Sequence, residues 1–253
     1  MAAREAHLFE LLLRLGDNCL ILGHRVSEWC GHAPVLEEDI ALANTALDLI
    51  GQANLWLGLA GDVEGKGRSA DDLAYLRDAW DFRNLLLVER PNGDFGATLM
   101  RQFLFDAWHV EMLQALLGSA DGRVAEIAGK SVKEAAYHLD RSSDLVIRLG
   151  DGTEESHRRM QAALEDLRPY VGEMFVDDAV DKALAEQAVA VLPSTLRSAW
   201  DARLGTVLRQ ATLQRPSDAF AQLGGRAGRH TEHLGYILAE MQFLQRAYPG
   251  ARW

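Results

Sequence analysis

The sequence predicts an all-α protein built on a ferritin-like four-helix bundle with additional C-terminal helices. Sustained apolar–polar alternation between hairpin turns, which indicates strands, is not found in it. Long stretches with apolar residues three and four positions apart recur instead, each ended by Gly or Pro. The four longest are joined in pairs by short turns, with a longer crossover between the pairs, as in ferritin-like bundles. An α-solenoid is the alternative, but these stretches are too long and unequal to form a repeat.

The expected helices follow from the periodic stretches and their Gly and Pro breaks. We expect four long helices over about 5–31, 36–60, 94–117 and 124–149, with a fifth helix over 71–88 in the crossover. Beyond these, the pattern predicts helices over 153–175, 177–190, 193–213 and 230–248, and a brief turn over 216–223. No linker is long enough to divide the chain. We therefore expect one ferritin-like domain over 1–253, with its core bundle at about 5–149 and C-terminal helices at about 153–248.

Composition excludes several classes of partner. The formal net charge is −11, whereas nucleic acids and anionic membranes require clustered Lys and Arg. No apolar run reaches the roughly 18–20 residues of a membrane span, and the first fifteen residues carry charges that a signal peptide lacks. Cys19 and Cys30 are expected to be buried thiols on one helix, as in a reducing compartment. We therefore expect a cytoplasmic protein that binds neither nucleic acid nor membranes.

The helix over 94–117 has a polar stripe inside its apolar face. Gln102, Asp106 and His109 fall in one sector of it, because three and four residues approximate one turn. Asp-x-x-His is half of a carboxylate-bridged metal pair, which also needs a Glu from each of two helices and a second such pair. Glu154-x-x-His157 begins a helix and is expected to be solvated surface.

The other helices do not complete this ligand set. Glu134 is followed three positions later by Tyr137, with His138 one step further, and the helix over 36–60 has Asn44 and Asp48 without a His. We therefore predict a buried hydrogen-bond network that binds no metal, and assign no catalytic, cofactor-binding or metal-ligating residue. The predicted network comprises Asn44, Asp48, Gln102, Asp106, His109, Glu134 and His138.

A second cluster lies near the C-terminus. Arg226 and Arg229 stand on the glycine-rich segment GGRAGR, and His230 and His233 follow in HTEH. Guanidinium groups of this kind can meet phosphate or the carboxylates of a partner. The glycine spacing has no preceding strand, so it is not a dinucleotide fingerprint. We expect these four residues to contact a partner or a phosphate group.

Six segments together resemble the C subunits of the bacterial ring-1,2-phenylacetyl-CoA epoxidases. They run in order from about residue 13 to residue 253, and the match is specific because no single short pattern carries it. The segments are LRLGDNCLILGHRVSEWCGHAP, DIALANTALDLIGQAN, LLLVERPNGDF, RQFLFDAWH, KEAAYHLDRS and HTEHLGYILAEMQFLQRAYPGARW.

The resemblance implies a ferritin-like subunit of a multicomponent oxygenase. In that family the catalytic A subunit holds the di-iron centre and binds the CoA thioester, and the C subunit has lost the iron ligands. The C subunit packs against A as a structural partner, and a small B subunit and a reductase that takes electrons from NAD(P)H complete the complex. The complex inserts one oxygen atom of O₂ into the aromatic ring of phenylacetyl-CoA during phenylacetate degradation.

By this resemblance no catalytic residue transfers to this chain and no cofactor is expected on it. Two alternatives stay open at this point. The chain is itself a di-iron carboxylate oxygenase, or its Arg226 and Arg229 contribute to docking the phosphates of an acyl-CoA.

Overall fold

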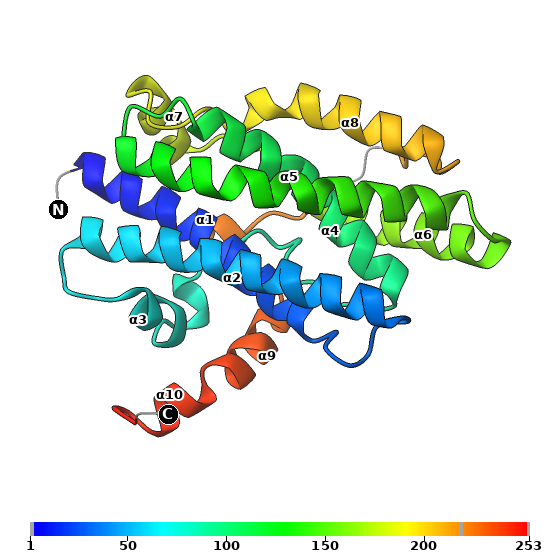
Figure 1. Ribbon diagram of the computed structural model, residues 1–253. Helices are drawn as coiled ribbons and strands as arrows, with labels where there is room; N and C mark the ends of the chain where they lie inside the picture. The colour runs from blue at the N-terminus through cyan, green and yellow to red at the C-terminus, as the bar shows by residue number, and fades with distance from the viewer. Residues whose placement is uncertain (1–2, 218–219, 252–253) are drawn as a thin grey trace. The chain divides into compact units, whose positions relative to one another are not determined.

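All regular structure in the described residues, 3–217 and 220–251, is helical in this computed structural model (Figure 1). The predicted all-α, ferritin-like class is confirmed. The chain forms two compact units, one of Met1–Pro91 with Gly224–Trp253 and one of Asn92–Leu223. The sequence predicts a core bundle followed by C-terminal helices. Instead, the helices after residue 224 belong with the first two long helices, and the helices between about 153 and 210 pack on the other two long helices.

The first unit is built on a hairpin of two long helices. α1 (Ala3–Ser27) and α2 (Leu36–Glu64) pack along their lengths, in blue and light blue in Figure 1. A Cβ on Gly16 of α1 would lie 2.7 Å from the Leu57 side chain, so Gly here permits the close approach. The buried apolar side chains of the hairpin include Leu12, Ile21, Leu22, Leu42, Leu49 and Trp56.

The crossover does not contain the helix that was predicted over 71–88. Only α3 (Ala70–Tyr75) and the 3₁₀ turn η1 (Ala79–Asp81) form there. The backbone N–H groups of Arg83 and Leu85 donate to the side chains of Asp17 and Asn18 on α1, each at 2.8 Å. These tertiary hydrogen bonds replace the helical ones, because a backbone N–H is satisfied equally well by a side-chain oxygen.

The C-terminal part of the first unit is a broken helix. A 3₁₀ turn, η5 (Gly225–Ala227), precedes α9 (Glu232–Met241) and α10 (Phe243–Ala247), so the single helix predicted over 230–248 begins later and is interrupted at Gln242. The buried Gln242 side chain donates to the backbone carbonyls of Ala74 and Arg77, both at 3.0 Å. This contact ties the C-terminal helices to the crossover.

The second unit is built on α4 (Phe95–Leu116) and α5 (Gly122–Gly150). α6 (Glu154–Leu167) and α8 (Arg197–Gln210) pack on both of them, so α4 is buried at every position from Thr98 to Val110. The chain between these two helices forms η2 (Arg168–Tyr170), η3 (Gly172–Phe175), α7 (Ala179–Glu186) and η4 (Pro193–Leu196).

Two expectations for this unit need correction. The helix predicted over 153–175 ends at Leu167, because Pro169 cannot donate the next helical hydrogen bond. The turn predicted over 216–223 is not helical at 216–217 or 220–223, and its residues 218–219 lie outside the described part of the chain.

One sequence expectation concerned membrane spans, and another concerned the burial of the two cysteines. Within residues 3–217 and 220–251, no helix combines the length and the apolar character that crossing a membrane requires. Cys19 is buried as expected, with its Sγ 3.8 Å from Gln52 Oε1. Cys30 is exposed, because α1 ends at Ser27 and does not carry the second cysteine into the interior.

Replacing Arg77 by Leu should strongly destabilise the protein. Arg77 and Asp17 form a buried ion pair, in which Nη1 lies 3.0 Å from Oδ2, so the substitution strands a carboxylate with no exposed surface. We expect a loss of about 3–5 kcal/mol in the free energy of unfolding, measured by urea denaturation. Lys130→Ala, which breaks an exposed pair with Glu126, is the control and should leave stability nearly unchanged, because solvent screens such a pair. Equal losses for the two variants would contradict the structural role of the pair.

Candidate functional site

A cluster of polar side chains is buried between the facing sides of α4 and α5. Gln102, Asp106 and His109 come from α4, and His138 and Ser142 come from α5. Each is 2% exposed or less. They meet because residues at three- and four-position spacing form one line along each helix, and both lines face inward. Four of the seven residues predicted to form a buried network are therefore brought together here.

Asp106 is the only carboxylate of this cluster. Its Oδ1 accepts a hydrogen bond from Gln102 Nε2 at 2.7 Å, and its Oδ2 accepts one from Ser142 Oγ at 2.8 Å. Burial raises the pKa of Asp106 to about 6, against the opposing effects of the nearby His138 charge and the two hydrogen bonds. Both carboxylate oxygens are thus occupied by neutral donors.

His109 lies in the same buried sector as a neutral imidazole. Burial lowers its pKa to about 3, with His138 as the second cause. The ring stacks on Phe105, with centroids 5.0 Å apart and planes 23° apart, and also on Trp108 at 6.3 Å. The imidazole is therefore packed as part of an aromatic layer on α4.

The donor set does not fit a di-iron group. The cluster offers one carboxyl and two imidazoles, whereas such a centre takes carboxylates from four helices together with two histidines. Across the described ranges, with residues 1–2, 218–219 and 252–253 set aside, no group of three or more His, Cys, Asp or Glu side chains is placed to hold a metal ion.

Three residues that were assigned to the buried network lie elsewhere. Asn44 and Glu134 are exposed and Asp48 is half-buried, and Asn44 and Asp48 belong to the first unit. At about 100° per residue, Asn44 points about 100° away from the buried Thr45. Glu134 lies about 60° from the line through Ser131, so it falls outside the covered sector. The assignment of Asn44 and Glu134 to a buried network was therefore wrong.

Sequence reasoning also missed members of the cluster. Ser142 donates to Asp106, and Ser131 is buried on the same line of α5. Their positions at +4 and −7 from His138 are a usable signal, because seven residues are close to two helical turns. Glu154 is exposed, and His157 Nδ1 lies 2.8 Å from the Gly150 carbonyl oxygen. Glu154 is therefore solvated as expected, whereas His157 is half-buried against the end of α5.

The second candidate cluster, in the first unit, is dominated by backbone packing. A Cβ on Gly225 would lie 2.1 Å from the Asn84 carbonyl oxygen, and one on Gly228, where φ is 75°, would lie 2.3 Å from that of Trp80. The glycines therefore let the loop approach the crossover closely. Arg226 is half-buried and Arg229 is exposed.

His230 joins this loop to a buried carboxylate. Its Nδ1 lies 3.0 Å from Glu89 Oε2, and its Nε2 lies 3.0 Å from the Phe82 carbonyl oxygen. Glu89 Oε1 also accepts from the Thr231 N–H at 2.7 Å. Both ring nitrogens therefore face oxygen atoms that can accept hydrogen bonds. His230 thus anchors the start of α9, and His233 is half-buried in the first turn of that helix.

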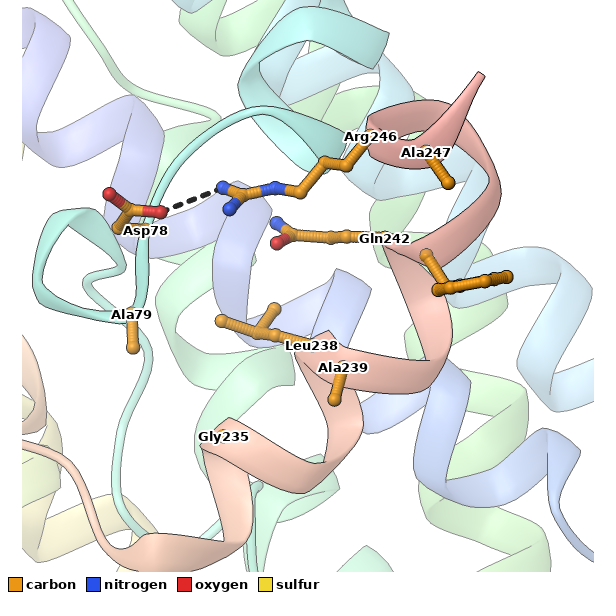
Figure 2. A pocket seen from close by; sticks show the side chains of 9 residues that line it. Asp78, Ala79, Gly235, Leu238, Ala239, Gln242, Arg246 and Ala247 are labelled. Atoms are coloured by element: carbon orange, nitrogen blue, oxygen red, sulfur yellow. Dashed lines mark hydrogen bonds and ion pairs between the residues drawn. The ribbon is translucent and has the colours of Figure 1, made fainter. Parts of the chain in front are cut away.

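A surface groove of about 510 Å³ runs beside α9 and α10. Figure 2 shows Leu238 and Gln242 on one side and Asp78 and Ala79 on the other. The charged groups at its rim are bound to each other, since Arg246 Nη2 lies 2.9 Å from Asp78 Oδ1. The remaining lining is mostly apolar, and the groove holds no set of groups for acid–base or nucleophilic chemistry.

The comparisons with known proteins agree on one family. The family described as phenylacetic acid catabolic protein matches residues 1–253 of this chain. The C subunit of the 1,2-phenylacetyl-CoA epoxidase of Escherichia coli (strain K12) is 50% identical over 241 residues, which are 95% of this chain and 97% of that protein.

The pKa of Asp106 predicts a specific dependence of stability on pH. The native protein keeps this proton up to about pH 6, whereas the carboxyl of an unfolded Asp loses it near its ordinary pKa of 3.8. The wild type therefore loses stability as the pH rises from about 4 to about 6, the full cost is present above pH 6, and in acid there is no such cost. Asp106→Asn removes this cost, so its stability relative to wild type should improve by about 2–3 kcal/mol between pH 4 and pH 7.

The measurement is urea denaturation of both proteins across this pH range. A difference between Asp106→Asn and wild type that stays constant with pH would contradict the raised pKa.

Gly225→Ala should loosen the C-terminal helices. The added Cβ would collide with the Asn84 carbonyl oxygen, a backbone atom that cannot rotate away. We expect a loss of about 1–3 kcal/mol and faster hydrogen exchange over residues 230–242. Gly235→Ala is the matched control, because a Cβ there meets nothing within 4 Å and should stabilise α9 slightly. Equal exchange rates in the two variants would be incompatible with this packing role.

Proposed function

Because this chain belongs to the family of phenylacetic acid catabolic proteins, we propose that it is the structural, non-catalytic C subunit of a phenylacetyl-CoA epoxidase. In this role it assembles with the catalytic di-iron A subunit and stabilises it. The small B subunit and a reductase complete the complex, which epoxidises the aromatic ring of phenylacetyl-CoA in phenylacetate catabolism. The iron and the electrons derived from NAD(P)H would reside on those other subunits.

The surroundings of Asp106 are the observation that carries the non-catalytic part of this proposal. Asp106-x-x-His109 has the spacing of a metal-binding pair on a bundle helix. Yet Gln102 and Ser142 already occupy both oxygens of the carboxylate, and His109 is stacked on Phe105. A metal would have to break both hydrogen bonds and would find no second carboxylate in this buried cluster.

The extent of the family match supports the role within a larger enzyme. The E. coli protein is named as one subunit of an epoxidase, and the aligned region leaves little of either chain uncovered. A subunit that lacks a reaction centre contributes to its enzyme through assembly. Such a role requires a lasting interface, which in stable complexes buries roughly 800 Å² on each partner.

The first test is co-expression of this chain with the catalytic subunit from the same source. We expect a stable complex of the two after affinity purification through a tag on this chain, with a mass by light scattering that exceeds either chain alone. Recovery of the two proteins as separate monomers would refute the assembly role.

Metal analysis of the same samples tests the non-catalytic role. Iron should follow the catalytic subunit, and the separately purified chain should hold much less than one iron per molecule. Close to two irons per chain, with oxygenase activity of the chain alone, would establish the alternative that it is itself a di-iron enzyme.

A further inference from the structure

One side of α2 is uncharged and largely exposed over five helical turns. We call it the α2 face and define it by Ile40, Asn44, Leu47, Gly51, Asn54 and the half-buried Gly58. Steps of three and four residues place these positions in a single line along the helix. Ile40 is 53% exposed and Leu47 is 66% exposed. Between Ile40 and Gly61 the sequence has one charged residue, Asp48, which is not on this line.

α5 shows what an ordinary exposed side looks like in this protein. It has the same length as α2, 29 residues. From Arg123 to Arg148 every exposed position of α5 is charged except Tyr137. Solvated helix faces are normally polar or charged, whereas a helix that is apolar on all sides is normally buried. The α2 face therefore has the composition of a covered surface.

Among the residues that the structure describes, none lies close enough to require the glycines of this face. A Cβ at Gly51 or Gly58 would meet nothing within 4 Å, and neither residue has a positive φ. Glycine in the middle of a helix is destabilising relative to Ala. Small residues do, however, allow a second helix to lie close to the first. On α2, large side chains such as Leu47 would then pack on either side of the point of close approach. The face thus fits another helix laid along α2.

Its size indicates the kind of chain that covers it. From Ile40 to Gly58 the face runs about 27 Å, at about 1.5 Å per residue, and a helix is about 10 Å wide. The resulting footprint of roughly 270 Å² is less than half of what a stable interface buries on each side. The occupant must also contact neighbouring elements, so it is a folded subunit rather than a single peptide. The exposed Val35 and Leu36, and the charged Glu37 and Asp62 at the two ends, extend and rim the surface.

We propose that the α2 face is the surface on which the catalytic subunit of the epoxidase docks, by laying an apolar helix along α2. This assignment rests on the proposed function, since a heteromeric enzyme supplies the partner. The partner is a folded α-helical protein with a complementary uncharged helix, and its closest approach is at Gly51.

The test uses the full-length chain co-expressed with the catalytic subunit. Leu47→Glu puts a charge in the middle of the face, and Tyr137→Glu puts the same charge on an equally exposed position of α5. We expect Leu47→Glu to weaken binding of the catalytic subunit at least tenfold, with an unchanged Tm of the isolated chain, and Tyr137→Glu to bind as wild type does.

Gly51→Leu is the second variant, and it separates close packing from charge. Because nothing lies near this position, the added side chain should leave the Tm of the isolated chain unchanged or higher. Close approach of a partner helix would nevertheless be blocked, so binding should again fall at least tenfold. Opposite directions for stability and binding in one variant cannot arise from misfolding.

The outcomes distinguish this inference from the proposed function. If the wild-type chain binds the catalytic subunit and both α2 variants bind equally well, the α2 assignment is wrong and the structural role stands. If the α2 variants abolish only self-association of this chain and leave the heteromer intact, the face joins two copies and the proposal is overturned. If the wild-type pair does not form, the proposed function fails and this inference fails with it.

Discussion

The ion pair between Asp17 and Arg77 is the interaction on which the first unit depends. Both side chains are buried, and a buried charge without its partner is far more costly than a buried pair. Arg77 also donates to the Asp81 carbonyl oxygen at 3.0 Å and lies over the Phe82 ring. The crossover is thereby held against α1 in an irregular path, and Gln242 attaches the C-terminal helices to that path. One pair of charges thus positions three segments that are far apart in the sequence.

The second unit also contains a buried carboxylate, but it compensates the charge in a different way. Its buried carboxylate, Asp106, accepts hydrogen bonds from two neutral side chains, Gln102 and Ser142. Burial raises the pKa of Asp106, and the two hydrogen bonds, which act in the opposite direction, do not cancel that effect. A carboxylate in this state is a packing element of the helix pair. The arrangement therefore favours a structural role for a position where related bundles use metal ligands.

The exposed sides of α2 and α5, two helices of equal length, differ in charge, and this difference bears on assembly. α5 presents charges to solvent, whereas α2 presents Ile40, Leu47 and open glycines. The chain has a formal charge of −11 and carries many charged residues elsewhere. The lack of charge along this side of α2 therefore indicates that the surface is constrained to be uncharged. In this chain the contrast separates a charged side of α5 from an uncharged side of α2, the one that we propose as a docking surface.

The sequence by itself determined the all-α class and the positions of the four long helices, because helical periodicity and chain breaks are local properties. The family followed from the six segments that resemble its members. The sequence also placed Gln102, Asp106 and His109 on one line, since their spacing is fixed by the helix alone. Tertiary structure decided the rest. The stretch 71–88 is largely irregular because Asp17 and Asn18, far away in sequence, bind its backbone. Asn44 and Glu134 lie at the edge of the apolar face of their helices, and the neighbouring helices leave them exposed. The local sequence pattern does not show how far a neighbouring helix covers that edge. The glycines of GGRAGR serve backbone packing, which only the position of the Asn84 carbonyl reveals.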